Sequence, residues 1–266
     1  MSKNMDVSKR KQSIIAGGLI SSAGIFFAKF IGLFYAVPYN SMLGTADNLA
    51  YYGVAFNIYS YLLNICTAGF PFAIATLIAK YSTRGDYQTS LLIKKLSASL
   101  MTCFGFGMMI IVILFSSPLA ALVMPDEGDS VKTMQMVLIL ISFALFFVPL
   151  LSSIRGFYQG LKHMEIYALS QVLEQVARVA FLLSASAIAV YALHTDQVWA
   201  LYFGVISTSI SAILAIMHLK LYDKKQMREL KRLAKTQEVA GNNDRREILK
   251  ELVFIAFPYL IVAILG

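Results

Sequence analysis

Long runs of apolar residues alternate along the chain with short polar segments that carry most of its charges. Six runs, at residues 14–38, 52–79, 96–123, 134–153, 166–193 and 199–219, are long enough to cross a bilayer, since an α-helix needs about 20 residues for the ~30 Å hydrocarbon core. A seventh begins near Leu252 and is cut off at Gly266, short of a complete span. The pattern predicts an all-α membrane protein with six complete transmembrane helices and a truncated seventh.

Composition supports this class, because 58% of the 266 residues are hydrophobic and only 14% are charged, whereas soluble domains carry about 25% charged residues. The net charge of +8 is unevenly distributed. Of the 23 Lys and Arg residues, all but Lys29, Lys132 and Arg178 lie before the first span or in the segments that share its side of the membrane. The segments on the other side are acidic, with Asp47, Asp126, Glu127, Asp129 and Asp196. The positive-inside rule then predicts a multi-pass plasma-membrane protein with a cytoplasmic N-terminus and no nucleic-acid partner.

The basic segment after the sixth span has a pattern of its own. Met227, Leu230, Leu233 and Ala234 recur at helical spacing among lysines and arginines, which predicts an amphipathic helix on the anionic inner leaflet. An ordinary solvated inner loop is the alternative. We therefore divide the chain into a six-helix lobe (1–219), a basic cytoplasmic linker (220–250) and the start of a seventh helix (251–266).

Lys29 lies within the first span, roughly 22 Å along the helix from Ile14 at 1.5 Å per residue. An ionised side chain at mid-bilayer costs on the order of 3 kcal/mol. Gly18, Ser22, Gly32 and Ala36 share its helical face, and small residues there favour a cavity or a helix interface over lipid. We interpret Lys29 as a cavity-facing cation, with snorkelling to the outer headgroups as the alternative.

Two other spans carry polar stripes. In the fifth span, Tyr167, Gln171, Glu174, Gln175 and Arg178 fall within an arc of about 100°, a face that hydrocarbon does not solvate. Glu174 and Arg178 are also spaced to form an i,i+4 ion pair, so a purely structural role is equally open. In the second span, Asn57, Ser60, Tyr61 and Asn64 share one face, where hydrogen bonding between helices is the alternative to a cavity.

Together these faces predict one hydrated substrate-binding cavity. Its candidate residues are Lys29, Asn57, Tyr61, Asn64, Gln171, Glu174, Gln175 and Arg178. Helix breakers at Gly69-Phe70-Pro71, Pro149 and Pro258 predict interruptions of the second, fourth and seventh spans. Broken helices are frequent in transporters, although static bundles contain them too.

Several signatures are absent from the sequence. The chain has no phosphate-binding loop, no zinc-protease motif and no nucleophile elbow. Its two cysteines, Cys66 and Cys103, lie in apolar segments without metal-ligand spacing. We therefore expect no enzymatic activity, no cofactor and no metal.

Several segments resemble the multidrug/oligosaccharidyl-lipid/polysaccharide exporter (MATE/MOP) superfamily, and within it the MurJ-like lipid II flippase and spore-cortex polysaccharide branch of Gram-positive bacteria. They are Arg155-Gly-Phe-Tyr-Gln-Gly160, Ser170-Gln-Val-Leu-Glu-Gln-Val-Ala-Arg178, Ala68-Gly-Phe-Pro-Phe-Ala-Ile-Ala75, Ala79-Lys-Tyr81 with Gly85-Asp86, and Ser21-Ser22, Lys29, Gly32 and Leu43-Gly44 of the first helix and its loop. The resemblance spans essentially the whole chain.

The resemblance implies two six-helix lobes around a central cavity, of which this chain holds the N-terminal lobe only. It also implies alternating access that carries an undecaprenyl-pyrophosphate-linked saccharide outward. Because the sequence has no nucleotide-binding loop, we expect an H⁺ or Na⁺ gradient or membrane potential to drive this transport. Lys29 matches a position where such flippases place a cation near the pyrophosphate. A second arginine of that pattern is replaced by Tyr35 or Ala36, and an acidic residue by the Ala50-Tyr51-Tyr52 region, so glycans other than lipid II remain open.

Two other functions compete with this one. A drug/cation antiporter of the same fold would need carboxylates in the cavity, and Glu174 is the one candidate there. A non-transporting membrane scaffold of cell-wall synthesis would need the basic segment and not the polar faces.

Overall fold

The computed structural model describes residues 22–24, 26–124 and 128–265, which are helical apart from short connections and contain no strand. The first helix runs to residue 34 and continues as α2 (Ala36–Leu43). The remaining elements are α3 (Ala46–Thr67), α4 (Phe70–Thr83), α5 (Tyr87–Leu114), α6 (Ser116–Val123), α7 (Asp129–Gly160), α8 (Met164–Ala187), the π-helical turn η1 (Ile188–Ala192), α9 (Val198–Thr236) and α10 (Arg245–Leu265). The predicted start of the first span at Ile14, Gly18, Ser21, the basic residues before Ile14, and Asp126 and Glu127 lie outside the described residues.

Seven helical segments are long and apolar enough to cross a membrane: Ser22–Leu43, Ala46–Thr83, Tyr87–Leu114, Asp129–Gly160, Met164–Ala192, Val198–Lys224 and Arg245–Leu265. Their number and order confirm the predicted all-α membrane fold. The seventh starts at Arg245 and not near Leu252, and its 21 residues meet the length criterion. The difference arises because the charged first turns of α10 interrupt the apolar pattern without interrupting the helix.

The predicted breaks are only partly correct. The second span does break, because Gly69 adopts a positive φ of 67° and Pro71 starts a new helix, α4. Pro149 and Pro258, however, lie inside the continuous helices α7 and α10, so the predicted interruptions there are wrong. A proline removes one backbone donor, and neighbouring groups in a helical membrane bundle compensate for that loss.

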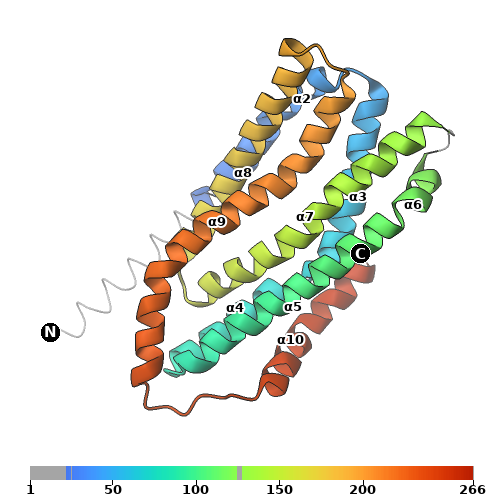
Figure 1. The fold of residues 1–266 in the computed structure, drawn as a ribbon. Coiled ribbons are helices and arrows are strands. Elements are labelled where there is room, and N and C mark those ends of the chain that lie inside the picture. The colour runs from blue at the N-terminus through green and yellow to red at the C-terminus, as the bar shows by residue number, and fades with distance from the viewer. Residues whose placement is uncertain (1–21, 25, 125–127, 266) are drawn as a thin grey trace.

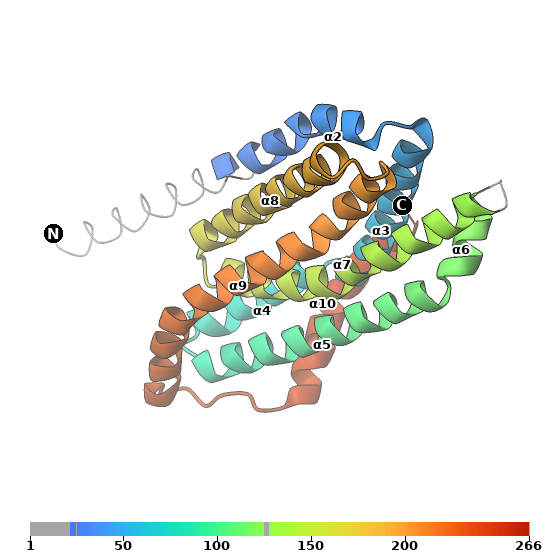
Figure 2. The same cartoon turned by 45° about the horizontal axis from the view of Figure 1, so that its top comes forward.

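Helices α7 and α9 form the centre of the bundle, and Figures 1 and 2 show the other helices arranged around them. Half of the most apolar stretch of α7 and 61% of that of α9 are buried within the chain, compared with 17% for α8 and α10. α7 packs against α5, α9, α4 and α3, and α8 packs along α9. The outer helices therefore present apolar faces that a bilayer or further protein would cover.

α9 is a single helix of 39 residues, so the predicted amphipathic helix is the continuation of the sixth span. Figure 1 shows the helix changing direction toward its C-terminal end. The apolar side chains of Leu230 and Ala234 are buried, and Met227 packs against the same core cluster. The apolar face thus lies on protein and not on the leaflet. Contact of the basic face with anionic lipid stays a prediction.

Candidate anion-binding site

The first helix, α7 and α8 line a pocket of about 330 Å³ that gathers charged and amide side chains. Figure 2 shows the first helix lying beside α8. The lining residues are Ala28, Lys29, Gly32, Arg155, Gln171, Glu174 and Gln175. The structure therefore brings together four of the eight predicted cavity residues, Lys29, Gln171, Glu174 and Gln175, and adds Arg155.

Arg155 is held in this pocket by two groups on α8. Its Nη2 atom lies 2.7 Å from Glu174 Oε2, with side chains that are 11% and 22% exposed. Its Nε–H donates to the Ser170 hydroxyl at 3.0 Å, and Ser170 itself is buried. The predicted i,i+4 pairing of Glu174 with Arg178 is thus replaced by a pairing between helices, because α7 brings Arg155 to the same face of α8.

Lys29 lines the pocket and has an exposed side chain. Among the described residues it has no carboxylate within ion-pair distance. One turn further along the helix, a Cβ at Gly32 would meet Gln175 Nε2 at 3.0 Å. The glycine therefore leaves room for the Gln175 side chain, and the expected small-residue face does contact α8 at this level.

Arg178 occupies a separate environment of aromatic side chains. Its Nη2 donates to the Tyr35 hydroxyl at 3.3 Å, and its guanidinium lies 5.4 Å from the Phe56 ring centre and 6.0 Å from that of Tyr35. Its Nε is buried and, in the part of the chain that the structure describes, has no hydrogen-bond partner. Arg178 therefore contacts aromatic rings and the Tyr35 hydroxyl, and it forms no ion pair with a carboxylate of the described residues.

The polar face of α3 does not reach this pocket. Asn57 and Tyr61 line a different, largely apolar groove of about 780 Å³ with residues of α5 and α6, among them Met108, Ile111 and Leu119, and with Phe115 between these helices. Asn64 is exposed further along α3. Within the described chain, the polar faces of α3 and α8 thus belong to two separate surfaces, and a shared cavity remains a prediction.

Sequence reasoning missed Arg155 as a site residue. Its position follows from α7 continuing to Gly160, which places Arg155 inside the helix and not in the predicted inner loop. If Arg178 does not pair with Glu174, then Glu174 needs another cation, and this need was the available signal. The sequence does not show, however, that Arg178 contacts aromatic residues instead. No cluster of three or more His, Cys, Asp or Glu residues that could hold a metal exists among residues 22–24, 26–124 and 128–265.

The arrangement of helices is that of a known class of membrane transporter. A multidrug resistance MATE family transporter of the MOP superfamily, solved in an outward-facing conformation, superimposes with a TM-score of 0.70 at 15% identity over 93% of this chain and 52% of that one. At this identity the similarity establishes the fold, a MATE-like six-helix lobe with a seventh helix. The chain is accordingly a multi-pass membrane protein.

Sequence similarity places the chain more narrowly. Residues 14–266 match the family described as Polysaccharide biosynthesis protein, and the chain belongs to that family. It is 31% identical over 257 residues to the Lipid II flippase MurJ of Bacillus subtilis (strain 168), covering 94% of this chain and 46% of that protein. It is 28% identical over 171 residues to Stage V sporulation protein B of the same organism, covering 64% of this chain and 32% of that protein. The chain thus spans less than half the length of both relatives.

Proposed function

We propose that this chain is the anion-binding lobe of a flippase that exports an undecaprenyl-pyrophosphate-linked saccharide, lipid II or a related precursor, by alternating access. The observation that carries the proposal is the pocket in which Lys29 and Arg155 face a single carboxylate, Glu174. Two cations against one anion give the pocket a net positive charge. The similarity to a protein named as a lipid II flippase supports this substrate class.

A linear diphosphate diester carries about two negative charges. Opposite unit charges 4 Å apart attract by about 4 kcal/mol at an effective dielectric constant near 20, against about 1 kcal/mol in water. A partly buried pocket on a membrane-facing lobe therefore suits a lipid-linked diphosphate, whose head group lies at the membrane surface while its chain stays in lipid. Without a nucleotide-binding loop in the sequence, we assign the driving force to an ion gradient or to membrane potential.

The experiment is complementation in a Bacillus strain that depends on one lipid II flippase. The chain is fused to the C-terminal half of the Bacillus subtilis relative, because it spans 46% of that protein. We expect the fusion to support growth and Lys29→Ala to abolish it. Lys132→Ala is the matched control, since Lys132 is exposed and its ion pair among the described residues is with the exposed Asp129. Full growth of Lys29→Ala at equal expression would refute the role of Lys29.

The second candidate is a drug/cation antiporter, because the superimposed transporter is a multidrug resistance protein. The positive pocket opposes cationic drugs, so we expect the fusion to confer no resistance to ethidium. Ethidium resistance without rescue of growth would favour the antiporter instead.

A further inference from the structure

Arg155 is only partly satisfied by the groups that hold it. A guanidinium has five N–H donors in a planar fork that suits carboxylate and phosphate oxygens. In the pocket, Nε–H donates to Ser170. Nη2 is buried and close to Glu174 Oε2, but it makes no well-aligned hydrogen bond to any described residue. Ser170 and Glu174 thus engage only part of the fork, and donors of the fork remain for another anion.

The balance of charges in the pocket also indicates that Arg155 is available to an anion. With Glu174 bound to Arg155, Lys29 is the one cation among the described lining residues that is left to face an incoming anion. A diphosphate with about two negative charges would be matched only if Arg155 were also available, and Arg155 lines the same pocket as Lys29. Ser170 fixes the guanidinium from the opposite helix, so Arg155 can change its anionic partner without leaving its place.

We propose that Glu174 is a built-in competitor of the diphosphate for Arg155: it pairs with the arginine in the empty pocket and yields it to the substrate. Arg155 is then the second cation of the site. The inference rests on the proposed function, since it names the partner of the same pocket. The displaced carboxylate has a cation nearby in Arg178, one turn further along α8, which has no carboxylate partner among the described residues.

A static ion pair makes the opposite prediction for Glu174. If the pair only fastened α7 to α8, removing either charge would leave the other one unpaired and would weaken folding and binding alike. If Glu174 competes with the ligand, removing its charge strengthens diphosphate binding, whereas removing the charge of Arg155 weakens it. The sign of the Glu174 effect, together with its disappearance when Arg155 is absent, therefore separates the two roles.

The test uses the full chain reconstituted in phosphatidylcholine nanodiscs, with geranylgeranyl diphosphate, geranylgeranyl monophosphate and inorganic pyrophosphate as probes. We expect Glu174→Gln to tighten binding of geranylgeranyl diphosphate roughly tenfold and Arg155→Gln to weaken it by a similar factor, the size of one interaction in a pocket of intermediate dielectric constant. The double variant should bind like Arg155→Gln, because the competitor has no effect once its target is gone. The monophosphate should respond less to both changes. Inorganic pyrophosphate tests whether the site takes a soluble diphosphate as well as a lipid one.

Glu251→Gln is the matched control, because Glu251 forms an interhelical ion pair with Lys80 between α10 and α4, away from the pocket. It should leave diphosphate binding unchanged. Weaker or unchanged binding by Glu174→Gln overturns the competitor role while leaving the proposed function in place, provided that Lys29→Gln still abolishes binding. If the wild-type chain binds none of the probes, or Lys29→Gln binds as the wild type does, the proposed function fails as well.

Discussion

At the scale of single residues, the side chains of the motif Arg155-Gly-Phe-Tyr-Gln-Gly160 lie on three faces of α7. Arg155 lines the pocket between the first helix, α7 and α8, and Tyr158 donates to the Asp223 carboxylate of α9. Gly156 and Gly160, one turn apart, face α4. A Cβ at Gly156 would lie 2.8 Å from the Pro71 carbonyl oxygen, and one at Gly160 would lie 2.7 Å from that of Ala75. The glycines thus let two backbones approach closely, as small residues do in membrane bundles.

This contact predicts a stability effect. Gly160→Ala places a methyl group against backbone and against the Ile78 side chain, so α4 and α7 must separate. We expect the free energy of unfolding to fall by about 1–3 kcal/mol, the usual cost of overpacking. The measurement is the midpoint of thermal unfolding of purified protein in detergent. Gly107→Ala is the control, because a Cβ there meets nothing within 4 Å. Equal midpoints for the two variants would refute the close contact.

The spacing of residues in the sequence predicted which side chains of α8 lie on one face. The spacing of Gln171, Glu174 and Gln175 correctly gave one face of α8, because helical period depends only on sequence separation. The partner of Glu174 was not predictable in the same way. Arg155 and Arg178 are both chemically suitable, and only the packing of α7 against α8 selects Arg155.

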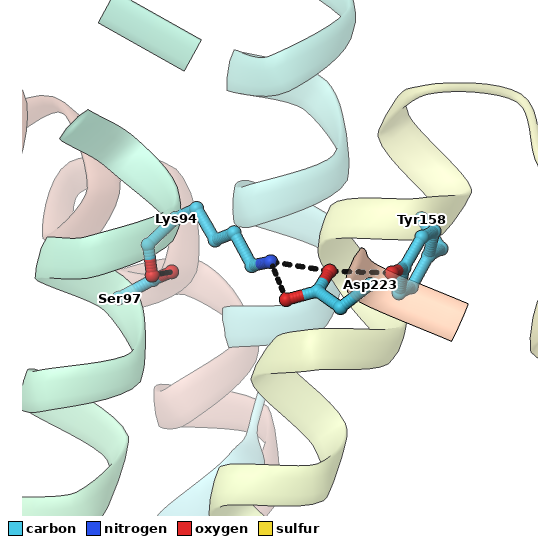
Figure 3. A network of polar contacts seen from close by, with 4 residues as sticks. All are labelled: Lys94, Ser97, Tyr158 and Asp223. Carbon is cyan, nitrogen blue, oxygen red and sulfur yellow. Dashed lines mark hydrogen bonds and ion pairs between the residues drawn. The ribbon is translucent and has the colours of Figure 1, made fainter. Parts of the chain in front are cut away.

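At the scale of elements, Asp223 of α9 belongs to a polar network between three helices. Lys94 of α5 donates to Asp223 of α9 at 2.6 Å, and the Tyr158 hydroxyl of α7 donates to the same carboxylate. Figure 3 shows Asp223 between the two donors. The Lys94 ammonium also lies 4.7 Å from the centre of the Phe157 ring. Asp223 thereby connects α9 to both α5 and α7. It lies at the end of the part of α9 that is apolar enough to span a membrane.

A second set of contacts holds the chain beyond α9. The Gln237 side-chain oxygen accepts from the backbone N–H groups of Tyr87 and Gln88, both at 2.9 Å, at the first turn of α5. The Asn242 N–H donates to the Thr89 hydroxyl at 2.8 Å, and the buried Asp86 accepts from the Thr89 N–H at 3.0 Å. The connection to α10 is therefore fixed on the start of α5. Its course could not be predicted, since its residues carry no periodic pattern.

Removing the Asp223 charge should loosen the end of α9. In Asp223→Asn, Lys94 loses its carboxylate while remaining partly buried. A hydrogen bond to a charged group contributes about 1.5–3 kcal/mol, so we expect a lower unfolding midpoint and faster hydrogen exchange in the last turns of α9. Hydrogen-exchange mass spectrometry in nanodiscs measures the second effect. Asp129→Asn changes an exposed pair with Lys132 and should alter neither quantity. Unchanged exchange in Asp223→Asn would show that the apolar contacts of Met227 and Leu230 suffice.

At the scale of the whole molecule, hydropathy was sufficient for the number and order of the membrane helices, because spanning a bilayer imposes a length and a composition on each segment separately. Hydropathy was not sufficient to predict which helices lie in the interior of the bundle. α7 and α9 are central and α8 and α10 are peripheral, yet the peripheral α10 has a mean hydropathy of 2.2 and the central α9 one of 2.0. Hydropathy does not separate the two positions, since lipid and protein interior favour the same residues.

The two ends of the bundle differ in charge, and this difference predicts its orientation. At one end, Gly44 approaches Gln197, which brings the loops after α2 and η1 together. At the other end, Asp86 contacts Gln237 and Asn242, near the basic residues of α4, α5 and α9. The positive-inside rule assigns the second end to the cytoplasm.

In a variant without Cys66 and Cys103, we expect Thr195→Cys to react with a membrane-impermeant maleimide in intact cells. Asn243→Cys should react only after the membrane is permeabilised. Because both positions lie in connections outside the helices, a reversed pattern of labelling would reverse the orientation. It would then place the Arg155 side of the pocket toward the outer leaflet.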